Sequence, residues 1–246
     1  MELSGHLALI TGAGQGIGRA CAEVFALKGA DLILFDKNPT ALTEVADQTA
    51  RTGRQVFTRA LDLTDIDALN KAVREVRTKG RIDILVNNAG FDRPGTVAKI
   101  STSDFLEVLS IHIVVPFTLI QLLLPDMRKA GWGRIINVSS IYALIGAKAE
   151  VAYSTAKAGV IGLTKSVAKE AGSDGVTVNT VLPGMTRTPT IEKFMADKYK
   201  QLIINNTPLG RMGEAEEIAS VIAFLSSDEA SFITGTPIPV SGGWGI

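Results

Sequence analysis

The feature that most constrains the fold is the regular alternation of short apolar runs with longer amphipathic stretches. The runs that have the length and composition of strands are LALIT (7–11), DLILF (31–35), QVFTRAL (55–61), IDILVN (82–87), GRIINVS (133–139), VTVNTVL (176–182) and PIPV (237–240). The helical patterns between them begin near Gly16, Pro39, Asp65, Ser103, Glu150 and Glu214. Because strands that alternate with helices form parallel βαβ units, we expect an α/β fold whose doubly wound parallel sheet has helices on both faces.

The length of the chain fits one domain. Its 246 residues contain no linker, repeat or low-complexity segment, so residues 1–246 are expected to form a single α/β domain. One long stretch, 183–208, lacks a strand or helix pattern and is rich in Thr, Met, Lys and Pro. A connection of that length is usually a lid or a binding loop, so a substrate lid is expected around 184–208.

Composition excludes several classes of function. Lys+Arg and Asp+Glu both number 25, and this zero net charge argues against an electrostatic grip on nucleic acid or an anionic membrane. With Cys21 as the only cysteine, no disulfide and no cysteine-rich metal site are expected. The N-terminus lacks the pattern of a signal peptide, and His112 and Pro116 interrupt the longest apolar run. We therefore expect a cytoplasmic protein with no membrane span.

A glycine-rich turn follows the first expected strand. The segment TGAGQGIGRA (11–20) places Gly12, Gly16 and Gly18 in a strand-to-helix turn, with the spacing G-x-x-x-G-x-G. Glycines in such a turn let the backbone approach a pyrophosphate, whose charge the helix N-terminus then holds. The segment predicts a dinucleotide site, and the alternative is a tight loop without a ligand.

An acidic residue ends the second expected strand, about twenty residues beyond this turn. Asp36 can accept hydrogen bonds from ribose hydroxyls and repel a 2′-phosphate, so it favours NAD over NADP. The alternative is a solvated carboxylate that opens the turn before Pro39. The neighbouring Lys37 and the neutral Gln15 weaken the preference.

A serine, a tyrosine and a lysine form the candidate catalytic group. Tyr153 and Lys157 are four residues apart, which places them on one face of a helix. An ammonium near a phenol lowers the phenol pKa, and the tyrosine can then act as an acid or base near neutrality. Ser140, at the end of a strand, can donate to a carbonyl oxygen that gains charge. Alone, the Tyr–Lys pair is equally typical of a packed tyrosine beside a solvated lysine.

Taken together, these motifs resemble the short-chain dehydrogenase/reductase family. The resemblance rests on TGAGQGIG, on NNAG (87–90), on a serine thirteen residues before Y-x-x-x-K, on Pro-Gly followed by a threonine, and on TGTPIPVSGG near the end. It runs in the family's order from Leu7 to Gly243. It implies a seven-stranded Rossmann-type sheet in the order 3-2-1-4-5-6-7. It also implies a homo-oligomer, usually a tetramer, assembled through helices around 103–129 and 150–172.

The resemblance also implies residue roles. Tyr153 would be the general acid or base, Lys157 would bind the nicotinamide ribose, and Ser140 would orient the substrate carbonyl. The cofactor, NAD rather than NADP, would contact Gly12, Gln15, Gly16, Ile17, Gly18, Asp36, Asp62, Leu63, Asn88, Ala89, Gly90, Tyr153, Lys157, Pro183, Gly184, Thr186 and Thr188. No metal is expected.

One position departs from the family. Its usual fourth catalytic residue is an asparagine, and that place holds His112 here. In the family the main-chain carbonyl of this residue holds a water linked to the catalytic lysine. Pro116 has no N–H and so cannot bond the carbonyl four residues before it, which leaves the carbonyl of His112 free. The alternative is a tolerated kink with a satisfied core histidine, and a histidine that titrates near pH 6–7 stays open.

The substrate is the least determined feature. Candidate pocket residues are Phe91, Arg93, Tyr142, Leu144, Met185 and Phe194, with Arg93 a candidate to hold an anionic group. The expected activity is interconversion of a small secondary alcohol and a ketone. Reductases of acyl-carrier-protein substrates and hydroxybutyrate-type dehydrogenases are alternatives; the former carry basic residues where Gly131 and Asp174 stand, and the latter carry a lysine where Glu150 stands. A non-catalytic NAD-binding subunit is the alternative from another class.

Overall fold

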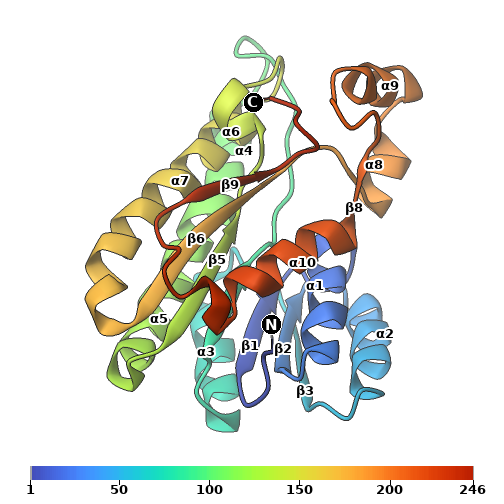
Figure 1. The fold of residues 1–246 in the computed structure, drawn as a ribbon. Coiled ribbons are helices and arrows are strands. Elements are labelled where there is room, and N and C mark those ends of the chain that lie inside the picture. Colours follow the sequence, from blue (N-terminus) through green and yellow to red (C-terminus); the bar gives the residue numbers. More distant parts are fainter. Residues whose placement is uncertain (1, 246) are drawn as a thin grey trace.

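A parallel sheet forms the centre of the molecule. The computed structural model describes residues 2–245, apart from the side chain of Phe194. The sheet has seven strands in the order β3-β2-β1-β4-β5-β6-β9, and every neighbouring pair is parallel (Figure 1). The strands are β1 (Leu7–Thr11), β2 (Asp31–Asp36), β3 (Val56–Ala60), β4 (Ile84–Asn87), β5 (Gly133–Val138), β6 (Val176–Pro183) and β9 (Pro237–Val240). The predicted fold class and strand order are therefore confirmed.

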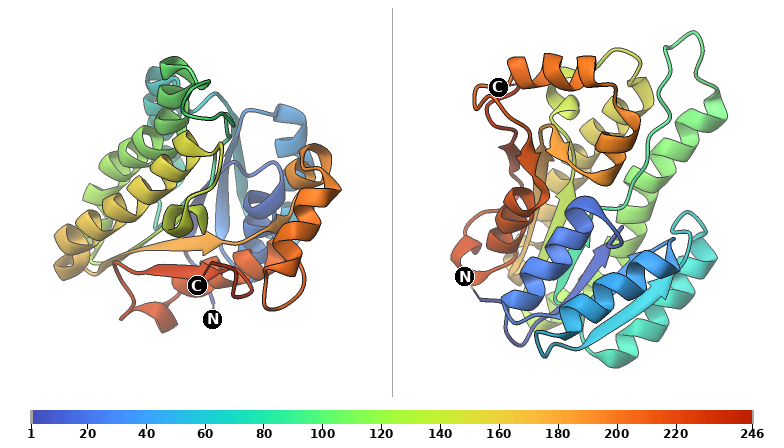
Figure 2. Two further views of the ribbon diagram at one scale, coloured as in Figure 1. Left: turned by 90° about the horizontal axis from the view of Figure 1, so that it is seen from above. Right: turned by 90° about the vertical axis from the view of Figure 1, so that its right-hand side faces the viewer.

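Helices cover both faces of the sheet (Figure 2). One face carries α1 (Gly16–Leu27), α2 (Pro39–Ala50) and α10 (Ala215–Leu225). The other carries α3 (Ile66–Val76), α5 (Val115–Ala130) and α7 (Val151–Ala171), and α4 (Thr102–Leu109) packs beside α7. The short 3₁₀ helices are η1 (Arg77–Lys79), η3 (Gly172–Asp174) and η4 (Asp228–Ala230).

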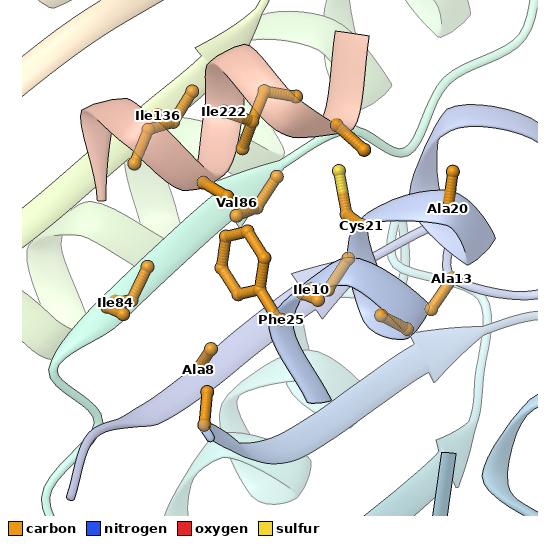
Figure 3. Packing of buried hydrophobic residues seen from close by; sticks show 14 of the residues in the cluster. Ala8, Ile10, Ala13, Ala20, Cys21, Phe25, Ile84, Val86, Ile136 and Ile222 are labelled. Carbon is orange, nitrogen blue, oxygen red and sulfur yellow. The ribbon is translucent and has the colours of Figure 1, made fainter. Parts of the chain in front are cut away.

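The core between α1, α10 and the sheet explains the apolar runs. Figure 3 shows Phe25 of α1 packed between β1 and β4, with Ile222 of α10 nearby. Burying such an aromatic side chain stabilises a fold by roughly 1.5–3 kcal/mol. Cys21 lies in the same cluster, and burial raises the pKa of its thiol, so it packs as an apolar residue.

Capping residues explain where the predicted helices begin. The Asn38 side chain accepts from the backbone of Thr40 and Ala41, and Pro39 follows at the first helical position of α2. Asp65 caps α3 through the Ala68 N–H at 3.0 Å. Predicted helix starts at these caps therefore fall within one residue of the observed ones.

The stretch 183–208 is more regular than expected. It contains β7 (Thr186–Arg187), which pairs with β8 (Gly213–Glu214), and two helices, α8 (Pro189–Phe194) and α9 (Asp197–Asn205). These helices stand away from the main sheet (Figure 1). The expectation of an irregular segment was wrong. Thr188 caps α8 and Pro189 starts it, but this helix signal covers few residues and lies in a segment whose composition is typical of a loop. A further short helix, α6 (Tyr142–Ile145), follows β5.

The run Thr102–Ala130 is long and apolar enough to cross a membrane by length and composition alone, with a mean hydropathy of 2.0. Half of its most apolar window is buried inside the molecule. Leu119, Leu123 and Met127 pack in the cluster beneath α3 and α7. Core packing therefore accounts for the buried half of this apolar run.

Candidate active site

The predicted site residues meet at the carboxyl ends of the parallel strands. The glycine loop follows β1, Asp36 ends β2, Asn88 follows β4, and Ser140 follows β5. Gly184 follows β6 and completes this edge. Ligands of open α/β sheets bind outside the carboxyl ends of the strands, so the sheet gathers residues far apart in sequence into one place.

The glycine loop is shaped for close approach of a ligand. Gly12 and Gly16 have φ of +63° and +53°, a region that favours glycine. A Cβ on Gly18 would lie 2.1 Å from the Gly12 carbonyl oxygen, so no larger residue fits there. Gln15, the N-cap of α1, makes no side-chain capping bond, so no N-cap side chain covers the N–H groups of the first turn. A pyrophosphate fits this loop.

Asp36 is held against the loop. Its Oδ2 accepts from the Gly14 N–H at 2.9 Å, and its Oδ1 accepts from the Asn38 N–H at 2.9 Å. The sequence left two roles open for the Asp36 carboxylate, and the structure combines them. The carboxylate opens the turn before Pro39, and it places a negative charge beside the glycine loop.

Asn88 supports the loop from β4. Its Nδ2 donates to the carbonyls of Thr11 and Gly12 at 3.0 and 3.2 Å. The Thr11 hydroxyl in turn accepts from the N–H groups of Asn88 and Ala89, both at 3.0 Å. Sequence reasoning did not single out Thr11; its signal was a polar residue at the end of an apolar strand. A dinucleotide loop held from two strands is a rigid cradle.

The remaining predicted cofactor residues surround this cradle. Leu63 is buried, and the Asp62 carboxylate accepts from the N–H and the hydroxyl of Thr64, which holds the Asp62 pKa below its usual value. A Cβ on Gly16 would lie 3.1 Å from Thr188 Cγ2, so the start of α8 covers the loop. Ile17, Gln15, Pro183, Gly184 and Thr186 lie in or beside the same two segments. All of these residues fit NAD(P).

The catalytic candidates converge between β5 and α7. The Lys157 Nζ donates to the Val138 carbonyl at 2.7 Å and lies 5.4 Å from the Tyr153 ring centroid. The Ser139 hydroxyl donates to the Lys157 carbonyl at 2.7 Å and ties α7 to the end of β5. Ser140, the next residue, lies beside the Tyr153 phenol and influences its proton.

The pKa directions differ from the expectation for the Tyr–Lys pair. Burial raises the pKa of Tyr153, the Ser140 hydroxyl acts against this, and Asp92 and Glu150 add to it. Burial also lowers the pKa of Lys157 to about 7. The expected lowering of the tyrosine pKa by an ammonium is therefore wrong for this structure, because desolvation outweighs it and Lys157 is directed to the Val138 carbonyl.

A buried chain of polar side chains fixes α7 to the sheet. The Asn87 amide donates to Asn137 at 2.8 Å, and the Asn137 amide donates to the Thr164 hydroxyl at 2.9 Å. The Thr180 hydroxyl bonds Thr164 at 2.5 Å. Buried hydrogen bonds of this kind hold one arrangement of neighbouring elements. The network thereby sets the position of α7, which carries Tyr153.

His112 lies in a single π-helical turn, η2 (Ser110–Val114), between α4 and α5. The Val115 N–H donates to the Ser110 carbonyl, five residues earlier. If the π register continued, the backbone N–H of residue 116 would donate to the Ile111 carbonyl, and in the α-helical register it would donate to the His112 carbonyl. Pro116 has no N–H and can donate to neither. The predicted helix irregularity is thus present, and π turns of this kind are frequent at functional sites.

The His112 side chain is buried beside Tyr153. Its Nε2 lies 2.9 Å from the Phe91 carbonyl, and since a carbonyl only accepts, Nε2 carries the proton. The ring meets the Tyr153 ring edge-to-face at 5.4 Å between centroids. Burial, with the charge of Lys157, holds the His112 pKa well below its usual value, so the ring is neutral near pH 7.

The predicted substrate residues are only partly brought together. Tyr142 meets Tyr153 at 6.4 Å and Trp244 at 5.4 Å between ring centroids, and Phe91 packs against α4 and α7. Leu144 is exposed, Met185 lies between β6 and β7, and the side chain of Phe194 falls outside the described part. The role suggested for Arg93 is not supported, because it pairs with Glu107 at 3.1 Å and stacks on Phe91.

Comparisons with known proteins agree with this geometry. Residues 12–245 match a family described as enoyl-(acyl carrier protein) reductase. The chain is 39% identical to the 3-oxoacyl-[acyl-carrier-protein] reductase FabG of Thermotoga maritima, covering 99% of both proteins. Levodione reductase is 34% identical with a TM-score of 0.94 over 98% of each chain. A candidate NAD(P)-dependent gluconate 5-dehydrogenase of Beutenbergia cavernae with bound NADP is 33% identical, with a TM-score of 0.93 over 99% of this chain and 98% of that one. The chain is an oxidoreductase of the short-chain dehydrogenase/reductase family.

Proposed function

We propose that the protein reduces a small, carrier-free ketone to a secondary alcohol, and catalyses the reverse oxidation, with NAD(H). The observation that carries this proposal is the convergence of Tyr153, Ser140 and Lys157 at the edge of the dinucleotide loop. When bound there, the nicotinamide supplies or accepts a hydride. The protein's own residues manage the proton and the substrate oxygen.

In the reductive direction the Tyr153 hydroxyl donates a proton to the substrate oxygen. Because burial favours the neutral phenol, the tyrosine rests in the form that donates. The Ser140 hydroxyl donates to the same oxygen while it gains negative charge. Lys157, whose Nζ lies 5.4 Å from the Tyr153 ring centroid, is the proposed source of the replacement proton, and its pKa of about 7 lets it release one near neutrality.

The carbonyl region around His112 and Pro116 is the proposed outer end of this relay. The π turn and the missing proline N–H leave an acceptor that a water can bridge toward Lys157. The neutral His112 ring holds the Phe91 carbonyl and packs on Tyr153, so its side chain acts as a positioning group.

NAD is the proposed cofactor because of the charge at Asp36. A 2′-phosphate on the adenosine ribose would meet this carboxylate, which is held in place by the Gly14 N–H. Like charges at such a distance are unfavourable, whereas ribose hydroxyls can donate to the same oxygens.

A 3-oxoacyl-carrier substrate is the second candidate, favoured by the FabG relatives. Two features weigh against it. Asp174 stands where carrier-binding members have a basic residue, and it pairs with Arg128 at 3.1 Å. Arg93 at the site is likewise paired with Glu107. Arg128 and Arg93 are therefore both paired with acidic side chains of this chain, which weakens them as binding groups for an acidic carrier protein.

We also propose a homo-oligomer, a tetramer by family resemblance, working in the cytoplasm. Leu106, Val114 and Phe117 on the α4–α5 run are 57%, 44% and 49% exposed, and they give this run an apolar surface for a second copy of the chain to cover. Light scattering after size-exclusion chromatography tests the assembly; a monomer would contradict it.

The test of the activity follows NADH and NADPH absorbance with three classes of substrate: free ketones, acetoacetyl-coenzyme A and acetoacetyl-carrier protein. We expect turnover of free ketones with NADH, and a loss of at least about 10²-fold in kcat for Tyr153→Phe with unchanged NADH binding. Preference for the carrier-bound substrate would establish the second candidate. NADH binding without turnover of any ketone or alcohol would indicate a non-catalytic subunit.

A further inference from the structure

We infer that Asp92 and Glu150 form a hydrogen-bonded pair of carboxyl groups beside Tyr153 that selects neutral substrates and excludes substrates with a carboxylate near the ketone. This inference rests on the proposed function and names its substrate class. It concerns two residues that neither the catalytic nor the cofactor assignments use.

The backbone holds the two residues together. The Gly95 N–H donates to the Ala149 carbonyl at 2.7 Å, and Gly95 forms a parallel bridge with Glu150. These bonds join the loop after β4, which carries Asp92, to the start of α7. Ala149 has φ +65°, the one non-glycine residue of the described chain with positive φ. Such a conformation persists only where the surroundings enforce it, often beside a functional site.

The Glu150 side chain is directed at the site and away from helix capping. Glu150 is the N-cap of α7 and makes no side-chain capping bond, so its carboxyl group is not used by the helix backbone. It lies three residues before Tyr153, on the same face of α7. Its Oε2 is buried without a hydrogen-bond partner among the described residues. A buried oxygen that receives no hydrogen bond from a protein donor fits a carboxyl group that shares a proton with a neighbouring acid.

Asp92 is fixed from the other side. It follows Phe91, whose carbonyl accepts from the buried His112 ring, and that ring packs on Tyr153. The Asp92 carboxylate accepts from the Arg93 N–H at 2.7 Å and lies close enough to the Glu150 carboxyl group to raise its pKa, so the two groups can share one proton. Both residues also raise the pKa values of Tyr142 and Tyr153, so their charge is felt at the catalytic hydroxyl.

The balance of charge around the pair disfavours anions. Burial and Asp92 raise the pKa of Glu150 to about 8, so the pair holds one negative charge at neutral pH. Arg93, the residue after Asp92, does not neutralise this charge, because its guanidinium pairs with Glu107 and Asp104. A substrate carboxylate would add a second charge here, whereas a hydroxyl or amide can donate to the free oxygens.

The experiment compares acetoacetate with acetoacetamide, which has the same shape without the charge. Each is tested as substrate and as competitor of ethyl acetoacetate at pH 6.5 with NADH. We expect acetoacetamide to exceed acetoacetate by about 100-fold in kcat/KM or in inhibition. At pH 6.5 Glu150 is protonated, so Glu150→Gln should leave this ratio nearly unchanged, whereas Asp92→Asn, which removes the negative charge of the pair, should reduce it about tenfold. Glu150→Lys should reverse the ratio, because a cation then faces the carboxylate. Glu170→Gln, at the exposed far end of α7, is the matched control and should leave the ratio unchanged.

The outcomes separate this inference from the proposed function. Turnover of ethyl acetoacetate with a ratio near one in the wild type, or an unchanged ratio in the soluble and active Glu150→Lys protein, overturns the carboxyl pair alone. If no ketone is reduced, the proposed function fails and the inference fails with it. A second readout is pH: the wild-type ratio should grow further above pH 8 as Glu150 ionises, and the Glu150→Gln ratio should not.

Discussion

Gly90 is a position at which a single methyl group should disturb the packing beside the catalytic tyrosine. A Cβ on Gly90 would lie 2.0 Å from His112 Cε1 and 2.8 and 2.9 Å from its two ring nitrogens. Real contacts of this kind are about 3.5–4.0 Å, so the ring must move by more than an ångström. His112 is only 4% exposed and bonds the Phe91 carbonyl, so it has little room to move without losing that bond.

The cost of Gly90→Ala can be worked from these contacts. Overpacking a buried site costs about 1–3 kcal/mol, and the lost hydrogen bond adds about 1 kcal/mol. Replacing glycine restrains the unfolded chain and returns roughly 0.4–1 kcal/mol. We therefore expect the free energy of unfolding to fall by about 1–3.5 kcal/mol, with a loss of activity because the His112 ring packs on Tyr153.

Urea denaturation of four proteins tests this: wild type, Gly90→Ala, His112→Ala and the double variant. Because His112→Ala removes the ring that the new methyl group meets, we expect the double variant to be at least about 1 kcal/mol more stable than additivity predicts. Gly162→Ala, where no atom lies within 4 Å of the added Cβ, is the control. Additive effects, or a loss below about 0.5 kcal/mol in Gly90→Ala, would refute the reasoning.

Three further predictions concern charge and the backbone. The folded-state pKa of Lys157 is about 7 against an ordinary lysine value of 10.5, so the full cost of burying its charge is present below pH 7 and is relieved as the pH rises to 10.5. Relative to Lys157→Met, the free energy of unfolding of the wild type should therefore rise by at most about 1.4 kcal/mol per pH unit between these values, as measured by urea denaturation. Parallel pH profiles of the two proteins would contradict this prediction. Asp36→Ser should improve kcat/KM for NADPH relative to NADH by about 10-fold or more, and an unchanged ratio would show that Asp36 does not select the cofactor. Pro116→Ala supplies an N–H to the π turn and should shift the pH–rate profile while His112→Asn keeps most activity; an unchanged profile for Pro116→Ala would remove the proton relay.

Local signals explain how much of the fold was predictable. The strand 7–11 is buried along its whole length, and its continuous apolar run predicted that. The helices predicted from Asn38-Pro39 and from Asp65 begin directly after these caps in the structure, since capping depends on residues that are neighbours in sequence. In 183–208 the same kind of signal was too short to outweigh the loop-like composition.

The candidate site divides in the same way. Gly12, Gly18 and the Tyr153–Lys157 spacing were readable because turns and helix faces are set by nearby residues. The proximity of Asp92 and Glu150 could not be predicted from the sequence, because the two residues lie on different elements.

By itself the sequence determined the alternation of strands and helices, the glycine turn, the positions of the catalytic side chains and the helix irregularity at His112, because each depends on residues close in the chain. Only the tertiary structure decided the directions of the pKa values of Tyr153 and Lys157, since burial depends on which elements pack around a group. It also decided that Gly90 must lack a side chain, because His112, from a distant helix, occupies that space.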